Sequence, residues 1–192
     1  MEERLSLRRR IALDITKKLQ DDVIMEHPLR QLFWECTLRC NHHCRHCGSD
    51  CKQTASTPDM PMADFAKVLD SVRAATDPHK VMINVTGGEP LLRPDLEACG
   101  RMMYEKEFPW GMVTNGWGLT PERYQRLLQS GLRAMTISLD GLEEDHDWMR
   151  GVPGSFKRAS AAIKMVSFLP PIGAPFSLRG LSSPRATHHG DG

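Results

Sequence analysis

The residues with the clearest chemical potential are three cysteines in one short polar segment, Cys40, Cys44 and Cys47, spaced C-x3-C-x2-C. Three thiolates on one loop can converge on a metal centre, and soft sulfur ligands favour iron–sulfur clusters, zinc or copper(I). A tetrahedral zinc site usually takes its fourth ligand from a second pair, and no second C-x2-C or H-x3-H pair stands outside this segment. Three cysteines can instead hold three irons of a cubane and leave the fourth iron open for chemistry.

Four predicted strands, each followed by a predicted helix, position this segment. The strands are apolar or β-branched runs at 31–35, 80–86, 110–114 and 133–139. Apolar residues at helical spacing follow at 62–76, from Pro94, from Pro121 and from Ser155. Alternating strands and helices are typical of a parallel sheet with helical crossovers, so the predicted fold class is α/β.

Each loop with chemically interesting residues leaves the carboxyl end of one of these strands. The four loops are 36–51, 86–90, 114–118 and 138–141. Functional residues of such sheets gather at this edge, and we expect these loops to meet there. Gly87 and Gly88 would let the backbone approach a ligand closely and adopt a positive φ, whereas without the cysteines they would indicate only a turn.

Length and charge exclude other classes of protein. The chain has 192 residues, too short for a complete eight-unit barrel of about 250 residues, and its formal charge of +1 gives no global case for nucleic acid. No stretch approaches the roughly 18 apolar residues of a membrane span, and charges throughout 1–18 leave no secretory signal. We therefore expect a cytoplasmic location, where thiols stay reduced and six cysteines indicate metal binding or catalysis.

Three regions are predicted along the chain. Residues 1–30 form an amphipathic helical segment, 31–169 form the α/β core, and 170–192 form a tail rich in proline, glycine and serine, typical of disorder. We expect this tail to stand where a next strand would follow, and the chain to be truncated at its C-terminus. His188 and His189 in the tail are expected to be inert.

The cysteine loop after the first strand and Gly87-Gly88-Glu89-Pro90 after the second together resemble the radical S-adenosylmethionine (radical SAM) enzymes. The resemblance implies a partial (β/α) barrel with about four units, a [4Fe–4S] cluster on Cys40, Cys44 and Cys47, and S-adenosylmethionine as cofactor. In that family the open iron binds the amino and carboxylate groups of the cofactor. An electron from the cluster then breaks a carbon–sulfur bond, which releases methionine and a 5′-deoxyadenosyl radical that abstracts hydrogen from the substrate.

The resemblance also implies roles for other residues. In relatives, the segment matching Gly87, Gly88, Glu89 and Pro90 hydrogen-bonds the methionyl amino group, with the last two fixing the turn. His46 stands where relatives often carry an aromatic residue that touches the adenine, and it could instead donate to a cluster sulfur.

Two further strand ends match the family pattern. Ser138 and Asp140, with Arg150 after them, resemble the arrangement in which a serine and an arginine meet the cofactor carboxylate, a task that suits the arginine fork. A solvated surface charge is the alternative for Arg150. Asn115 lies in a Thr-Asn-Gly segment common in relatives and is expected to line the cofactor or substrate side.

The amino-acid sequence of residues 32–51, LFWECTLRCNHHCRHCGSDC, resembles that of the peptide- or protein-modifying (SPASM/twitch-like) branch of this family, and within it the group encoded beside lipoproteins. This implies an oxidoreductase or maturase with a peptide or protein substrate and an external one-electron donor of the flavodoxin or ferredoxin type.

Two other hypotheses stay open. One is a zinc-binding interaction module, and the other is a non-catalytic remnant of a radical SAM enzyme. The residues that could complete a zinc site are Cys36, Cys51, His42, His43 and His46. The simplest interpretation of Cys36 and Cys51 is that of ordinary thiols, and Cys99 is expected in the core.

Overall fold

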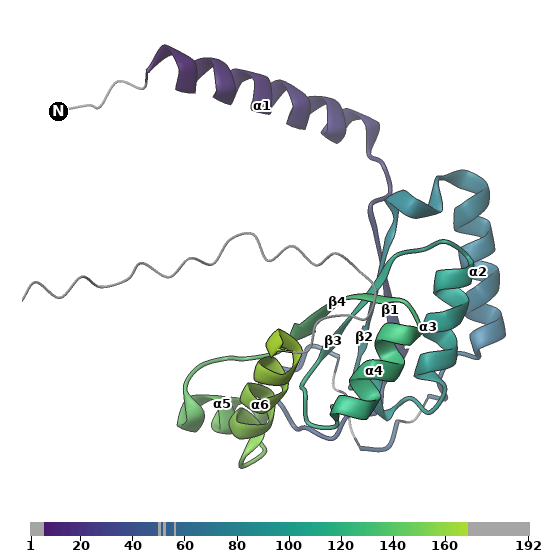
Figure 1. The fold of residues 1–192 in the computed structure, drawn as a ribbon, viewed down its shortest axis with the longest axis vertical. Helices are drawn as coiled ribbons and strands as arrows, with labels where there is room; N and C mark the ends of the chain where they lie inside the picture. Colours follow the sequence, from purple (N-terminus) through teal and green to yellow (C-terminus); the bar gives the residue numbers. More distant parts are fainter. Residues whose placement is uncertain (1–5, 50, 52, 56, 169–192) are drawn as a thin grey trace, which may run out of the picture.

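The fold is centred on a sheet of four parallel strands in the order β1-β2-β3-β4 (Figure 1). It is seen in a computed structural model that describes residues 6–49, 51, 53–55 and 57–168. The strands are β1 (Gln31–Thr37), β2 (Met82–Gly87), β3 (Trp110–Thr114) and β4 (Leu132–Ile137). Parallel strands that pair in chain order are the arrangement of a barrel wall, so the predicted α/β class with a partial (β/α) barrel is confirmed.

Helices connect the strands and follow the last one. The helices α2 (Met62–Ala75), α3 (Leu96–Glu105) and α4 (Pro121–Gln129) cover one side of the sheet in Figure 1. Two 3-10 turns precede β2 and α3, namely η1 (Pro78–Lys80) and η2 (Pro90–Leu92), while α5 (Glu143–Arg150) and α6 (Ser155–Phe168) follow β4. The predicted start of α4 is confirmed in detail, because the Thr120 side chain accepts a hydrogen bond from the Arg123 amide at 3.2 Å.

The predicted N-terminal helix is present as α1 (Leu7–Glu26), which projects away from the sheet in Figure 1. Its apolar side chains Leu7, Ile11, Ile15 and Leu19 are exposed. In the described part of the chain, no helix combines the length and the apolar character needed to cross a bilayer. The predicted tail at 170–192 lies outside the described residues.

The hydrophobic core lies between the sheet and α2, α3 and α4. The inner face of α3 consists of Leu96, Cys99 and Met103, all fully buried, so the core position expected for Cys99 is confirmed. The largest other buried apolar side chains come from both layers and are Leu69, Ile83, Phe108, Trp110 and Leu127. This core supports the sheet edge from which the four predicted loops leave.

A buried arginine holds together the two ends of the long segment that connects β1 to α2. Arg93 donates hydrogen bonds to the Cys36 carbonyl at 2.6 Å and to the Met60 carbonyl at 2.9 Å. Its charge is balanced by Asp95, 2.8 Å from the guanidinium Nε. Both ends of the segment that contains the cysteine loop are thereby attached to one side chain.

Helix α5 (Glu143–Arg150) was not expected from the sequence. Of its residues only His146 is buried, so it has no apolar stripe from which a helix could be predicted. Three acidic residues fill its first turn, where they interact favourably with the helix dipole, and Gly151 ends it with a left-handed φ of 65°. This helix contributes directly to the site described below.

The contact between α3 and β3 yields a stability prediction. A Cβ atom on Gly100 would lie 2.4 Å from Cζ2 of Trp110, whose indole is fully buried and donates to the Ser130 carbonyl. We expect Gly100→Ala to lower the free energy of unfolding by about 1–3 kcal/mol, despite the better helix propensity of alanine, because an overpacked core cannot relax around a fixed indole.

Urea denaturation measures this change. Gly118→Ala is the matched control, because its added Cβ would meet only Leu91, at 3.8 Å, and its stability should stay near that of the parent chain. Equal stability of the Gly100 variant and the parent would contradict the prediction.

Candidate functional site

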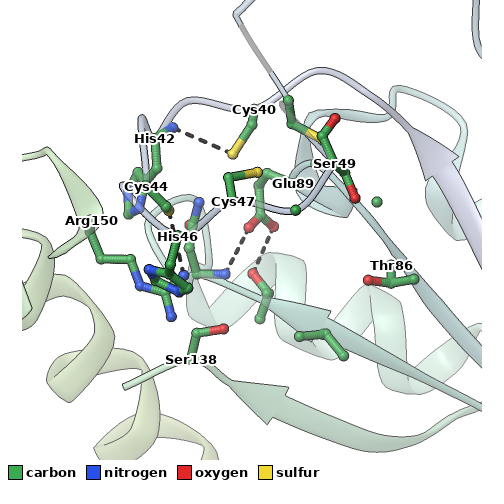
Figure 2. A pocket seen from close by; sticks show the side chains of 17 residues that line it. Cys40, His42, Cys44, His46, Cys47, Ser49, Thr86, Glu89, Ser138 and Arg150 are labelled. Carbon is green, nitrogen blue, oxygen red and sulfur yellow. Dashed lines mark hydrogen bonds between the residues drawn. The ribbon is translucent and has the colours of Figure 1, made fainter. Parts of the chain in front are cut away.

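One cavity brings together the loops at the carboxyl ends of all four strands (Figure 2). Its lining includes most of the predicted site residues, namely Cys40, Cys44, His46, Cys47, Gly87, Gly88, Glu89, Asn115, Ser138 and Arg150. Pro90 and Asp140 do not line it: Pro90 is buried in η2, and Asp140 lies behind Arg150. The expectation that these loops meet at one edge therefore agrees with the structure.

The three cysteines of the predicted metal site differ in exposure. Cys40 is buried, Cys44 is half-buried and Cys47 is exposed. Burial raises the pKa of the Cys40 thiol, while a hydrogen bond from the His42 amide to its Sγ, at 3.5 Å, opposes this. Among the described residues, no group of three or more Cys, His, Asp or Glu side chains is arranged to hold a single metal ion. An iron–sulfur cubane is larger than one ion, so its cysteine ligands need not converge on one point. Three soft thiols around one cavity fit an iron–sulfur cluster.

The glycines after β2 pack against the chain that enters the cysteine loop. Gly88 and Glu89 donate amide hydrogen bonds to the carbonyls of Thr37 and Arg39, both at 2.8 Å. A Cβ would lie 2.3 Å from the Thr37 oxygen at Gly87, which has a φ of 114°, and 2.1 Å from the Arg39 oxygen at Gly88. The close approach in the structure is made to the backbone of the cysteine loop, and the approach to a ligand stays a prediction.

Glu89 is a buried carboxylate with three hydrogen-bond donors. Its oxygens accept from the Thr114 hydroxyl at 2.7 Å, the Asn115 amide at 2.7 Å and the Leu91 amide at 3.1 Å. Burial raises its pKa, which the three donors oppose. Glu89 therefore caps η2 and joins the end of β2 to the end of β3.

Asn115 connects the β3 loop to the cysteine loop. Its side-chain amide donates to Asn41 Oδ1 at 2.8 Å, and its oxygen accepts from the Trp117 amide at 2.9 Å. The Ser138 amide donates to the Thr114 carbonyl at 3.0 Å and so fixes the end of β4 in the same way. These contacts hold the walls of the cavity in place.

The C-terminus of α5 supports the other side of the cysteine loop. The amides of His43 and Arg45 donate to the carbonyls of Arg150, at 3.2 Å, and Met149, at 2.9 Å. The Arg45 side chain donates to the Trp148 carbonyl at 3.1 Å, with its guanidinium 4.5 Å from the centre of the Trp148 ring. Carbonyls of the last turn of α5 thus accept hydrogen bonds from the loop.

Arg150 is not the solvated charge that the sequence left as an alternative. Its side chain is 12% exposed, and its Nε lies 2.6 Å from one carboxylate oxygen of Asp140. Nη2 donates to the other oxygen at 3.0 Å, and Nη1 lies 3.7 Å from Cys44 Sγ (Figure 2). The guanidinium therefore connects β4, α5 and the cysteine loop.

Two further residues that line the cavity, His42 and Cys51, were predicted only as possible completing ligands of a zinc site. His42 is 2% exposed, and the described residues offer neither of its ring nitrogens a hydrogen-bond partner. Burial, followed by the charge of Arg150, lowers its pKa to about 4. Cys51 lines the cavity as a buried thiol, whose pKa burial raises to about 11. No periodicity reports which side chains of an irregular loop point inward. Cys99 lies in the core as expected, and Cys36, interpreted from the sequence as an ordinary thiol, is buried there too.

The "Radical SAM superfamily" model matches residues 34–167 of the chain. The AdoMet-dependent heme synthase of Methanosarcina barkeri is 31% identical over 145 residues, which are 75% of this chain and 41% of that protein. The GTP 3′,8-cyclase of Sulfurovum sp. is 33% identical over 111 residues, 57% of this chain and 33% of the cyclase. The chain thus spans about two fifths or less of the length of these curated relatives.

Solved structures share the fold. Native anSMEcpe with bound AdoMet superposes with a TM-score of 0.61 at 20% identity, over 73% of this chain and 41% of the other. Streptococcus suis SuiB bound to the precursor peptide SuiA gives a TM-score of 0.56 at 17% identity, over 86% and 38%. At these identities the likeness concerns the fold alone.

The glycine packing predicts how the cysteine loop responds to one methyl group. We expect Gly88→Ala to displace the loop, because the new Cβ cannot coexist with the Arg39 carbonyl, and to reduce bound iron after anaerobic reconstitution several-fold. Iron per chain is the measurement. The control is Gly48→Ala, which lies in the cysteine loop itself and has nothing within 4 Å of the added Cβ. It should bind iron like the parent. Equal iron in both variants would contradict the prediction.

Proposed function

Because the chain belongs to the radical SAM superfamily, we propose that it is the core of an enzyme that cleaves S-adenosylmethionine reductively at a [4Fe–4S] cluster. Cys40, Cys44 and Cys47 would hold the cluster. The observation that carries the proposal is the single cavity in which these thiols face the Gly87–Glu89 segment and Arg150. When bound, the cluster supplies the electron that breaks a carbon–sulfur bond and yields a 5′-deoxyadenosyl radical.

The residues around the thiols have the chemistry to bind and orient the cofactor. The Gly87–Gly88 backbone would accept from the methionyl amino group, with Glu89 and Pro90 holding that turn in place. Ser138 and Arg150 would meet the carboxylate, with Asp140 orienting the guanidinium. His46 would contact the adenine, and Asn115 would keep the β3 loop closed over the cavity.

The substrate class has two candidates. The first is a peptide or protein, proposed from the amino-acid sequence of the cysteine loop. It is in keeping with the fold shared with SuiB, whose structure was solved with a precursor peptide. The second is an iron-bearing tetrapyrrole, because relatives at 31% identity are an AdoMet-dependent heme synthase and an Fe-coproporphyrin III synthase. An external one-electron donor of the flavodoxin or ferredoxin type and a cytoplasmic location complete the proposal, since cluster thiols need a reducing compartment.

Reconstitution tests the cofactor chemistry. We expect anaerobically reconstituted chain to be brown and to form 5′-deoxyadenosine from S-adenosylmethionine when dithionite is added. Replacing any of Cys40, Cys44 or Cys47 by alanine should remove the cluster absorbance and this product. Cys99→Ala, outside the cavity in α3, should retain both. One bound zinc with no iron would favour the zinc-binding module instead.

A binding measurement separates the two substrate classes. Iron-coproporphyrin III is titrated into the reconstituted chain and followed by its visible absorbance. A saturable shift that S-adenosylmethionine strengthens is expected for a tetrapyrrole enzyme, because cofactor and substrate then share one cavity. Absence of saturation up to high micromolar concentration would leave the peptide class as the better candidate.

A further inference from the structure

Arg150 contacts one of the three cysteine ligands directly. Its Nη1 lies 3.7 Å from Cys44 Sγ, which is within hydrogen-bond distance for sulfur (Figure 2). Cys44 is half-buried and the arginine side chain is 12% exposed, so water screens this contact only in part.

The guanidinium is held in this position from both ends of the residue. The carboxylate of Asp140 contacts Nε and Nη2 of the guanidinium, at 2.6 and 3.0 Å. This leaves the Nη1 group to face the cavity. Asp140 is itself fixed, because its amide donates at 3.1 Å to Nδ1 of His146, which is 1% exposed. The Arg150 carbonyl accepts from the His43 amide at 3.2 Å, which keeps the backbone beside the same loop.

We propose that Arg150 donates an N–H···S hydrogen bond to the Cys44 thiolate and thereby raises the reduction potential of the cluster. The inference rests on the proposed function and adds a role to the one proposed for this arginine toward the cofactor. Reduction adds one negative charge to a cluster whose ligands are already anionic, and a cationic donor on a ligand sulfur stabilises the reduced state more than the oxidised state. Hydrogen bonds to the sulfurs and net charge are among the factors that set such potentials.

The test measures the midpoint potential of the reconstituted 192-residue chain by EPR-monitored titration without S-adenosylmethionine. Arg150→Gln should shift the potential to a more negative value, because both the charge and the donor geometry are lost. Arg150→Lys should lie between this variant and the parent, because an ammonium keeps the charge without the fork. The matched control is Arg158→Gln, which removes an arginine positioned over the Trp117 ring at 5.5 Å. Its potential should equal that of the parent.

Each outcome decides between the contact and a general charge effect. An unchanged potential in Arg150→Gln, or an equal shift in Arg158→Gln, overturns the inference. If Arg150→Gln does not retain its cluster, Arg150→Lys decides, and a potential equal to that of the parent then overturns the inference. A parent chain that takes up no cluster counts instead against the proposed function, so the two failures are distinguishable.

Discussion

A buried carboxylate that needs hydrogen-bond donors organises this site. Glu89 is 1% exposed, and a carboxylate at such a position is costly unless donors surround it. It takes them from Thr114, Asn115 and Leu91, so the ends of β2 and β3 can lie only where all three reach its two oxygens. The same turn supplies the amides of Gly88 and Glu89 to the chain leaving β1. The floor of the cavity is therefore fixed by one side chain and its own turn.

The cysteine loop is held by backbone contacts on two sides, to which the side chains of Asn41 and Arg45 add further hydrogen bonds. On one side the carbonyls of Thr37 and Arg39 accept from the β2 turn, and on the other the amides of His43 and Arg45 donate to α5. Among the described residues, Cys40 Sγ accepts from the His42 amide at 3.5 Å and Cys44 Sγ lies 3.7 Å from Arg150 Nη1, while the main chain makes the contacts that position the loop on both sides. A loop anchored in this way can keep its shape while its thiols serve as ligands.

What could be predicted from the sequence depends on whether a signal is local. The strand Trp110–Thr114 and the start of α4 at Pro121 were predicted because apolar runs and helical spacing act over a few residues. The cysteine spacing is local too, and it indicated the chemistry. Two of the three partners of Glu89 lie 25 and 26 residues away in the chain, and the orientation of His42 depends on what packs over its loop. Such long-range pairings follow from the assembled sheet and leave no pattern in the sequence.

Helix α5 shows how an element without a sequence signal can still determine the site. Its polar composition hides it, yet its last carbonyls hold the cysteine loop and its last residue places a guanidinium beside Cys44. Loop and arginine therefore move together, since one helix end carries both. Gly151 makes this arrangement possible: it has a φ of 65°, and a Cβ there would lie 2.6 Å from the His43 oxygen. A side chain at this position would separate the helix end from the loop, so the loop and its arginine can lie this close only where the helix ends in glycine.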